Sequence, residues 1–199
     1  NEKAIFTGNY DFTKSGETAD LSICECEITN GAILTIPSNK TLTVKGKITN
    51  NGTEDKLNVN NDGNLIQTED DAVNNALATI YRNSLMKRLD YTYWSSPVTG
   101  QQLKSFSPGT LNARFMEYKE EDDLFHAVPD VYTNFEIGKG YAIRAFNNYT
   151  QETLFPGVFK GEINNGRIGI GLGHTPPITT PNSTHIVSGY NVVGNPYPS

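Results

Sequence analysis

Short apolar alternations recur along the first third of the chain at a spacing of roughly 20 residues, and this repeat limits the possible folds more than any other feature. Each alternation supplies only one or two inward side chains, so no strand can close a core alone, whereas stacked coils bury a continuous aliphatic column. The repeat therefore predicts a short right-handed parallel β-helix-like segment at the N-terminus. The apolar positions are Leu21, Ile23, Leu34, Ile36, Leu42, Val44, Leu57, Val59 and Leu65.

Turn signals of one kind separate these alternations, at Asn30-Gly31, Asn51-Gly52 and Asp62-Gly63, where a left-handed backbone costs little. The same dipeptides would also permit an antiparallel meander of hairpins. The repeated unit, however, contains two strands with a fixed internal offset, which a simple meander does not require. We therefore favour the β-helix over the meander.

The segment 68–89 fits two local structures. Asp70 and Asp71 could cap a helix with apolar residues on one face. Asparagines and β-branched residues lower its helical propensity, however, and residues 78–82 alternate well enough for a strand. We predict a loop followed by a strand, with a short helix as the alternative.

After Asp90 the pattern changes to longer strands rich in aromatic residues, which predicts a domain resembling a β-sandwich. We therefore expect an all-β fold in two parts: a β-helix-like repeat segment over residues 1–85 and a β-sandwich-like domain over residues 86–199, truncated at its C-terminus. Asn164-Asn165-Gly166 is the clearest hairpin turn, and we interpret the proline-containing stretch 175–181 as a surface connection. The expected strands are residues 91–94, 114–118, 140–145, 154–162 and 190–193.

The composition excludes several classes of function. The 16 basic and 22 acidic residues give a formal charge of −6, and no basic run exists to neutralise a phosphate backbone, so we expect no nucleic-acid partner. No apolar stretch approaches the roughly 20 residues of a membrane-spanning helix, and the N-terminus lacks a signal core, so we expect no membrane insertion. Because the chain begins at Asn1 and ends in the turn-rich string GNPYPS, we expect a fragment of a longer protein.

One cluster of ionisable residues could suggest acid/base chemistry: the run Glu120-Glu121-Asp122-Asp123, followed by His126 and Asp130. Consecutive residues point in different directions, whereas a glycosidase needs two opposed carboxylates on rigid elements. We interpret the run as the solvated tip of a hairpin. We therefore expect no catalytic residues and no enzyme activity.

Other short motifs favour structural roles. Ser95-Ser96-Pro97 lacks the G-x-S-x-G surroundings of a nucleophile elbow. The glycine-rich strings at 138–140 and 169–173 do not open onto a helix, so we expect no phosphate or cofactor site. In the string 195–198, either X-Pro bond could be cis, and we assign this string a turn-locking role.

The two cysteines do not indicate a metal site. Cys24 and Cys26 form a C-x-C pair, in which a disulfide would close a very small, strained ring. A metal site needs about four ligands, and the histidines, His126, His174 and His185, are far away in the sequence. We interpret both thiols as small buried residues, although the spacing leaves open whether they are free.

Tyr91, Tyr93 and Trp94 are the best candidates for a platform that stacks on sugar rings. In a strand, Tyr91 and Tyr93 share one face and Trp94 takes the other. A lone tryptophan is more often a packing anchor than a ligand contact, so we expect Trp94 in the core. No residue is assigned to ligand binding on this basis.

Four sequence blocks, taken together, resemble a module of large exported proteins of Bacteroidota, notably flavobacteria. The likeness covers the chain from about Ala19 onward. It implies a substrate of the type IX secretion system, delivered to the cell surface or the medium, although the C-terminal sorting domain common in such proteins is absent here. The family offers no established catalytic residues to carry over. The blocks are Gly63-Asn64-Leu65-Ile66-Gln67, Tyr91-Thr92-Tyr93-Trp94-Ser95-Ser96-Pro97-Val98, Gly138-Lys139-Gly140-Tyr141 and Gly189-Tyr190-Asn191-Val192-Val193-Gly194-Asn195-Pro196-Tyr197-Pro198-Ser199.

These observations predict a non-catalytic segment of a large secreted or cell-surface bacterial protein that acts as a structural scaffold or adhesin. The alternative is a carbohydrate-binding or accessory module of an exported polysaccharide-degrading protein. The expected partners are other cell-surface or secretion-system proteins, or extracellular polysaccharide. The sequence specifies no metal or cofactor.

Overall fold

The computed structural model describes residues 2–12, 19–175 and 189–199. Helical structure in these ranges is limited to three single turns, η1 (Glu54–Lys56), α1 (Leu103–Phe106) and η2 (Asn112–Arg114). None of the described helices has the length and apolarity that a bilayer crossing requires. The strands are β1 (Lys3–Phe6), β2 (Tyr10–Asp11), β3 (Leu21–Ile23), β4 (Glu25–Ile28), β5 (Leu34–Ile36), β6 (Thr41–Val44), β7 (Ile48–Asn50), β8 (Leu57–Val59), β9 (Asn64–Gln67), β10 (Leu77–Met86), β11 (Tyr91–Trp94), β12 (Val98–Thr99), β13 (Phe115–Lys119), β14 (Leu124–Ala127), β15 (Tyr141–Arg144) and β16 (Thr153–Ile163).

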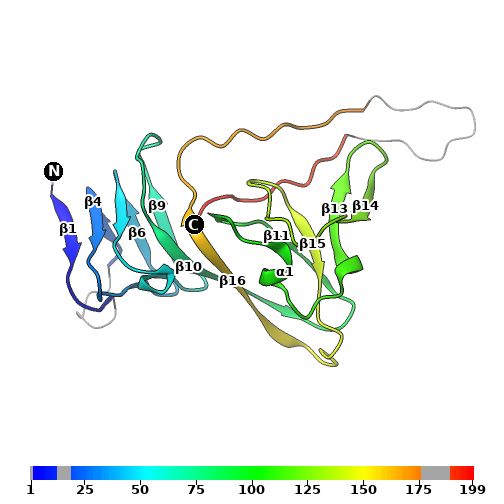
Figure 1. Ribbon diagram of the computed structural model, residues 1–199, viewed down its shortest axis with the longest axis horizontal. Helices are drawn as coiled ribbons and strands as arrows, with labels where there is room; N and C mark the ends of the chain where they lie inside the picture. The colour runs from blue at the N-terminus through cyan, green and yellow to red at the C-terminus, as the bar shows by residue number, and fades with distance from the viewer. Residues whose placement is uncertain (1, 13–18, 176–188) are drawn as a thin grey trace, which may run out of the picture.

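The N-terminal strands form a solenoid of about three coils, drawn in blue to cyan in Figure 1. Its three sides are sheets in the orders β1-β4-β7, β2-β5-β8 and β3-β6-β9, and every pairing within them is parallel. Equivalent positions stack in register, for example Leu34 beside Leu57 and Leu42 beside Leu65. The predicted β-helix-like segment is confirmed, and the antiparallel meander is wrong.

The inward side chains of the solenoid form the aliphatic column that the repeat predicted. In the first coil, Leu21 and Ile23 are only half-buried, because a coil covers them on one side alone. Gly31 (φ 92°) and Asp62 (φ 61°) adopt the left-handed backbone at two of the expected turns. Of the positions that the repeat predicted as inward, those at most 2% exposed are Leu34, Ile36, Leu42, Val44, Leu57, Val59 and Leu65.

Cys24 and Cys26 lie on either side of a corner rather than within one strand. Cys24 follows β3 and is half-buried, whereas Cys26 lies inside β4 and is 1% exposed. Both are free thiols, and burial raises the pKa of Cys26 to about 12. Cys26 is therefore the small buried residue that the sequence predicts, while the corner leaves Cys24 partly accessible.

Strand β10 joins the solenoid to the rest of the chain. Thr79 and Ile80 pair in parallel with β8, so β10 starts a further layer on one side of the solenoid. Along its whole length β10 also pairs antiparallel with β16, and both strands run diagonally across Figure 1. The predicted loop followed by a strand over residues 68–89 is confirmed. Because β10 belongs to both parts, the division of the chain at residue 85 stays a prediction.

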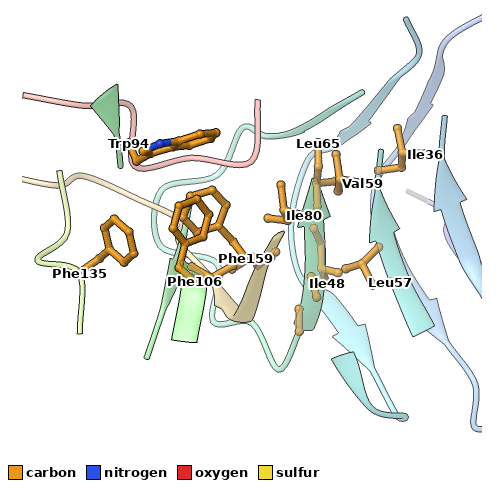
Figure 2. Close-up of a cluster of buried hydrophobic side chains, with 14 of the residues drawn as sticks. Ile36, Ile48, Leu57, Val59, Leu65, Ile80, Trp94, Phe106, Phe135 and Phe159 are labelled. Atoms are coloured by element: carbon orange, nitrogen blue, oxygen red, sulfur yellow. The ribbon is translucent and has the colours of Figure 1, made fainter. Parts of the chain in front are cut away.

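The remaining strands form an antiparallel unit, which we define as residues 91–163. Its four-stranded sheet, in the order β11-β15-β13-β14, faces β16 across a cluster of aromatic rings. Ring centroids are 5.0 Å apart for Trp94 and Phe106, and 4.4 Å apart for Phe106 and Phe159. Figure 2 shows this cluster beside the aliphatic column, and Ile80, which pairs with Phe159, lies between the two. The all-β fold, with a solenoid followed by an aromatic-rich, sandwich-like part, is confirmed.

Four of the five strands expected after Asp90 are present. Strand β11 has the expected bounds, and β13, β15 and β16 differ from theirs by one residue at each end. Residues 190–193 do not form a strand, which corrects the fifth expectation. Only Val193 forms a bridge there, with Lys139, because the edge that it meets is just a few residues long.

The expected hairpin at residues 164–166 is also wrong. Gly166 has the left-handed backbone of a turn (φ 76°), but residues 167–175 form no strand that could return along β16. Both X-Pro bonds between residues 195 and 198 are trans. Most of the proline-containing stretch 175–181 lies outside the described residues.

Candidate functional site

Three of the four sequence blocks line one groove of about 640 Å³, which we call the seam groove. Its aromatic lining comes from Trp94 and Phe159 of the core, Tyr93 of β11 and Tyr197 of the tail, where the tail means residues 189–199. Arg82 of β10 adds a cation. Residues more than 100 positions apart in the sequence therefore meet at the junction of the solenoid and the antiparallel unit.

The tail is fixed along the seam groove by backbone hydrogen bonds. The amide of Gly140 donates to the carbonyl oxygen of Val192 (3.1 Å), and the amide of Gly194 donates to that of Gly138 (2.9 Å). A Cβ atom at position 194 would overlap the side chain of Ser95, so this close approach requires a glycine. The block GKGY thus holds the tail against the block YWSSPV.

The end of the tail reaches the solenoid. The amide of Leu65 in β9 donates to the carbonyl oxygen of Pro198 (3.0 Å). The side-chain amide of Asn164 donates to the carbonyl oxygen of Pro196 (2.8 Å), which connects the tail to the end of β16. All four sequence blocks therefore meet at the C-terminal end of the solenoid.

The other two solenoid sheets are covered at the same end. Beyond β7, the amide of Asn50 donates to the carbonyl oxygen of Asn75 (2.8 Å), and the amide of Asn75 donates to that of Ile48 (3.1 Å). Beyond β8, the sheet continues into β10 and β16. Each of the three strand edges therefore has backbone hydrogen-bond partners from residues that follow the repeat.

Two polar side chains of the seam groove, Arg82 and Asn191, are hydrogen-bonded within the fold. The Arg82 guanidinium donates to the carbonyl oxygens of Asn60 (3.3 Å) and Gly63 (3.1 Å) in a solenoid turn. Burial lowers the pKa of Arg82, and the nearby Asp62 carboxylate opposes this change. The side-chain amide of Asn191 donates to the carbonyl oxygen of Gly173 (3.0 Å). Arg82 and Asn191 therefore stabilise the groove through contacts with backbone carbonyls.

The serines of the YWSSPV block have no activating base among the described residues. The Ser96 hydroxyl donates to the carbonyl oxygen of Val98 (2.7 Å), a local contact that shapes the chain before Pro97. The Ser95 hydroxyl is buried and has no hydrogen-bond partner in the described part of the chain. A serine nucleophile is activated by a base within hydrogen-bond reach, and neither serine has one in the part of the chain that the structure describes.

Lys139 of the GKGY block belongs to a half-buried cluster of ion pairs. Its ammonium lies 2.7 Å from the Glu117 carboxylate and 3.1 Å from that of Glu136, while Lys119 lies 2.9 Å from Glu117. Burial alone would raise the pKa of Glu117, but hydrogen bonds from Lys139 and Lys119 outweigh it and lower that pKa. Burial likewise opposes the charge of Lys139, yet its carboxylate partners raise its pKa. Lys139 is therefore a fixed cation that anchors the 138–140 loop.

The acidic run 120–123 forms the turn between β13 and β14, so the predicted hairpin is confirmed. One member is not solvated, because the buried Glu120 carboxylate accepts hydrogen bonds from the amide (2.6 Å) and the hydroxyl (2.8 Å) of Thr175. His126 contacts Asp122 (2.7 Å) on the surface. Within the described ranges, no three His, Cys, Asp or Glu side chains are grouped to hold a metal ion. His185 lies outside those ranges.

A family model fits residues 5–199, across the solenoid, the antiparallel unit and the tail. The chain belongs to this family, described as Domain of unknown function (DUF8693). No curated protein and no solved structure matches the chain. The DUF8693 match includes all four sequence blocks, so the residues that bring the tail to the solenoid are part of one family unit.

The DUF8693 fold separates the three aromatic residues proposed as a stacking platform. Tyr91 (41% exposed) and Tyr93 (63%) lie on the solvent side of the four-stranded sheet, whereas Trp94 (7%) lies in the aromatic core. The packing role predicted for Trp94 is confirmed. We call the solvent side of this sheet the outer face.

Two further aromatic residues, which sequence reasoning missed, complete the outer face. The Phe125 ring lies 6.0 Å from that of Tyr93 and 5.3 Å from that of Tyr118, centroid to centroid. The hydrogen bond from the Tyr118 hydroxyl to the Asp123 carboxylate raises the pKa of Tyr118 to about 12. The predicted hairpin could have revealed both residues in the sequence, because Tyr118 and Phe125 occupy facing positions on either side of the acidic turn.

Proposed function

We propose that the chain is a non-catalytic scaffold segment of a large exported bacterial surface protein. In this role the solenoid is a stiff spacer, and the antiparallel unit is the cap at its end. One observation carries the proposal: every sheet of the solenoid is continued or covered at its C-terminal end by residues that follow the repeat, namely Asn75, β10 and Pro198.

The continuous core supports stiffness. Aliphatic residues of the solenoid and aromatic residues of the antiparallel unit belong to one buried cluster, connected through Ile80 and Phe159. Burial of one large apolar side chain contributes about 1.5–3 kcal/mol relative to exposure. Bending the junction would expose several of these side chains at once, so the two parts should move as one body.

The absence of a catalytic role is supported by the state of the polar groups. The cluster around Glu117 is held by lysines, Glu120 is bound to Thr175, and Arg82 is bound to backbone carbonyls. Catalytic acids and bases instead need a free position facing substrate. We propose export by the type IX route in a bacterium of the Bacteroidota, on the strength of the four sequence blocks alone.

Surface exposure can be tested on cells that make the full-length protein. Intact cells would be treated with protease and then probed with an antibody against the antiparallel unit. We expect the epitope to be lost from intact cells or found in the medium. An epitope that becomes accessible only after lysis contradicts the exported role, and release of reducing sugar from polysaccharides by the purified chain contradicts the non-catalytic one.

The second proposed function is carbohydrate binding, as a binding or accessory module. The exposure of Tyr91 and Tyr93 on the outer face favours it, because planar aromatic side chains pack on the apolar faces of sugar rings. This function concerns the antiparallel unit alone, and it is compatible with a spacer role for the solenoid.

A further inference from the structure

We infer that the outer face binds an acidic polysaccharide, with tyrosines stacked on its sugar rings and arginines paired with its carboxylates or sulfates. This ligand class rests on the second proposed function, carbohydrate binding. The residues that carry it come from both edges and from the centre of the four-stranded sheet.

Strand register places these residues on one face. Tyr91 pairs with Arg144 and Tyr93 pairs with Ala142, so these side chains point to the same side of the sheet. Ala142 is small and 5% exposed, and the Tyr93 ring of β11 contacts the Phe125 ring of β14, although these strands are the two edges of the sheet. The result is an aromatic surface that spans the four strands.

Two arginines extend this surface. Arg114, the last residue of η2, immediately precedes Phe115, and Arg144 immediately follows Ile143. Since Phe115 and Ile143 pair antiparallel, the two arginines lie next to the same end of this strand pairing. Arg114 is exposed, whereas Arg144 is 8% exposed. Within the described residues neither arginine has a carboxylate within the 4.0 Å of an ion pair.

Arg144 also has a donor without an acceptor. Its Nη2 donates to Oδ1 of Asn147 (2.7 Å), but its buried Nε–H has no partner among the described residues. A buried donor that is left unpaired is unfavourable, and an anion that enters beside it removes that penalty. The strand positions of the outer face carry no carboxylate that could already pair with Arg144, and the Asp123 carboxylate at the hairpin end of the face is hydrogen-bonded to Tyr118.

An acidic polysaccharide suits this arrangement better than a nucleic acid. Tyrosines and arginines can bind both, but a nucleic-acid site must neutralise many closely spaced phosphates, and this chain has a formal charge of −6 and no basic run. Two arginines beside two exposed tyrosines instead match a polymer that alternates apolar sugar faces with single charges.

The test is binding of the purified chain to polygalacturonate, measured by isothermal titration calorimetry and by affinity electrophoresis. We expect binding that weakens as NaCl is raised. Arg114→Glu and Tyr93→Ala should each weaken it by about tenfold. The matched controls are Lys47→Glu, the same charge change on an exposed solenoid residue, and Tyr132→Ala, the loss of a tyrosine that is 60% exposed elsewhere. Both controls should bind like the parent.

Several outcomes overturn the inference. Equal affinity for a neutral galactan contradicts the inference of an acidic ligand and leaves the proposed carbohydrate binding intact. If the chain binds neither polymer, both the inference and the proposed carbohydrate binding are wrong. Equal weakening by Lys47→Glu and Arg114→Glu shows a general charge effect and removes the outer face as the site. Tighter binding of a single-stranded oligonucleotide than of polygalacturonate assigns the face to nucleic acid. Circular dichroism on each variant excludes loss of the fold.

Discussion

The solenoid and the antiparallel unit both bury an apolar core, but they build it by different means. The solenoid stacks an equivalent aliphatic side chain in each successive coil, as at Leu34 and Leu57, and each coil is covered by the next. The antiparallel unit gathers a few large rings around Trp94 and Phe106, from segments that are distant in the sequence. The solenoid thus distributes its stability along the chain, whereas the antiparallel unit concentrates it in one cluster.

The largest expected effect is that of Trp94→Ala, which tests whether the stability of the antiparallel unit is concentrated in its aromatic cluster. Trp94 contacts Phe106, Phe155 and Phe159, so its loss should cost about 3–5 kcal/mol of the free energy of unfolding. Because the core is continuous, we expect one cooperative transition at lower denaturant concentration, measured by circular dichroism. Tyr93→Ala, an exposed neighbour in β11, is the control. Two separate transitions would show that the solenoid folds independently.

Leu57→Ala tests whether the stability of the solenoid is distributed along its coils. Leu57 is fully buried between coils, and removing its side chain should cost about 3 kcal/mol. We expect loss of protection from hydrogen exchange in β5 and β8 before it spreads to β13 and β15. If β13 exchanges as early as β5, the solenoid does not store its stability locally.

Gly194→Ala tests the contact between the two parts. The added methyl group would overlap the Ser95 side chain, so the tail must shift, at a cost of about 1–3 kcal/mol. The expected readout is faster hydrogen exchange at the Leu65 amide, which donates to Pro198 in the native tail. Gly171→Ala, where a Cβ would meet nothing within 4 Å, is the matched control. An unchanged hydrogen-exchange rate of the Leu65 amide in G194A would show that the tail is not held through position 194.

The smallest expected effect is the pH dependence that Glu117 contributes. Its folded-state pKa lies below the ordinary 4.5, so its stabilisation is present above pH 4.5 and is lost as the pH falls through the lowered pKa. In Glu117→Gln, the free energy of unfolding, measured with urea, should therefore fall less steeply as the pH drops below 4.5. Glu121→Gln on the hairpin turn is the comparison. An unchanged slope in E117Q would mean that the lysines do not set this pKa.

Sequence reasoning succeeded where the fold is local. The inward positions of the solenoid follow from period-two alternation and a repeated spacing, so Leu42 and Leu65 could be placed in one column before their pairing was known. Strand β11 and the burial of Trp94 follow from the same alternation. These features need no information from distant parts of the chain.

The tail could not be placed in this way. Its partners, Leu65 and Asn164, lie far from it in the sequence, and no periodicity connects them to Pro196 or Pro198. The expected strand at residues 190–193 failed for the same reason, because a strand exists only where a neighbour offers a long enough edge. The outer face was half predicted: Tyr91 and Tyr93 came from alternation, but the arginines required the register of three strands.

The long ladder between β10 and β16 has a mechanical consequence. It aligns ten residue pairs, its hydrogen bonds run across the strands at alternate pairs, and β10 itself leads from the solenoid into the antiparallel unit. Leu77, where the chain enters β10, pairs with Glu162, near where the chain leaves β16, so tension on the two ends of the chain loads the ladder at one end and peels its pairs apart one by one.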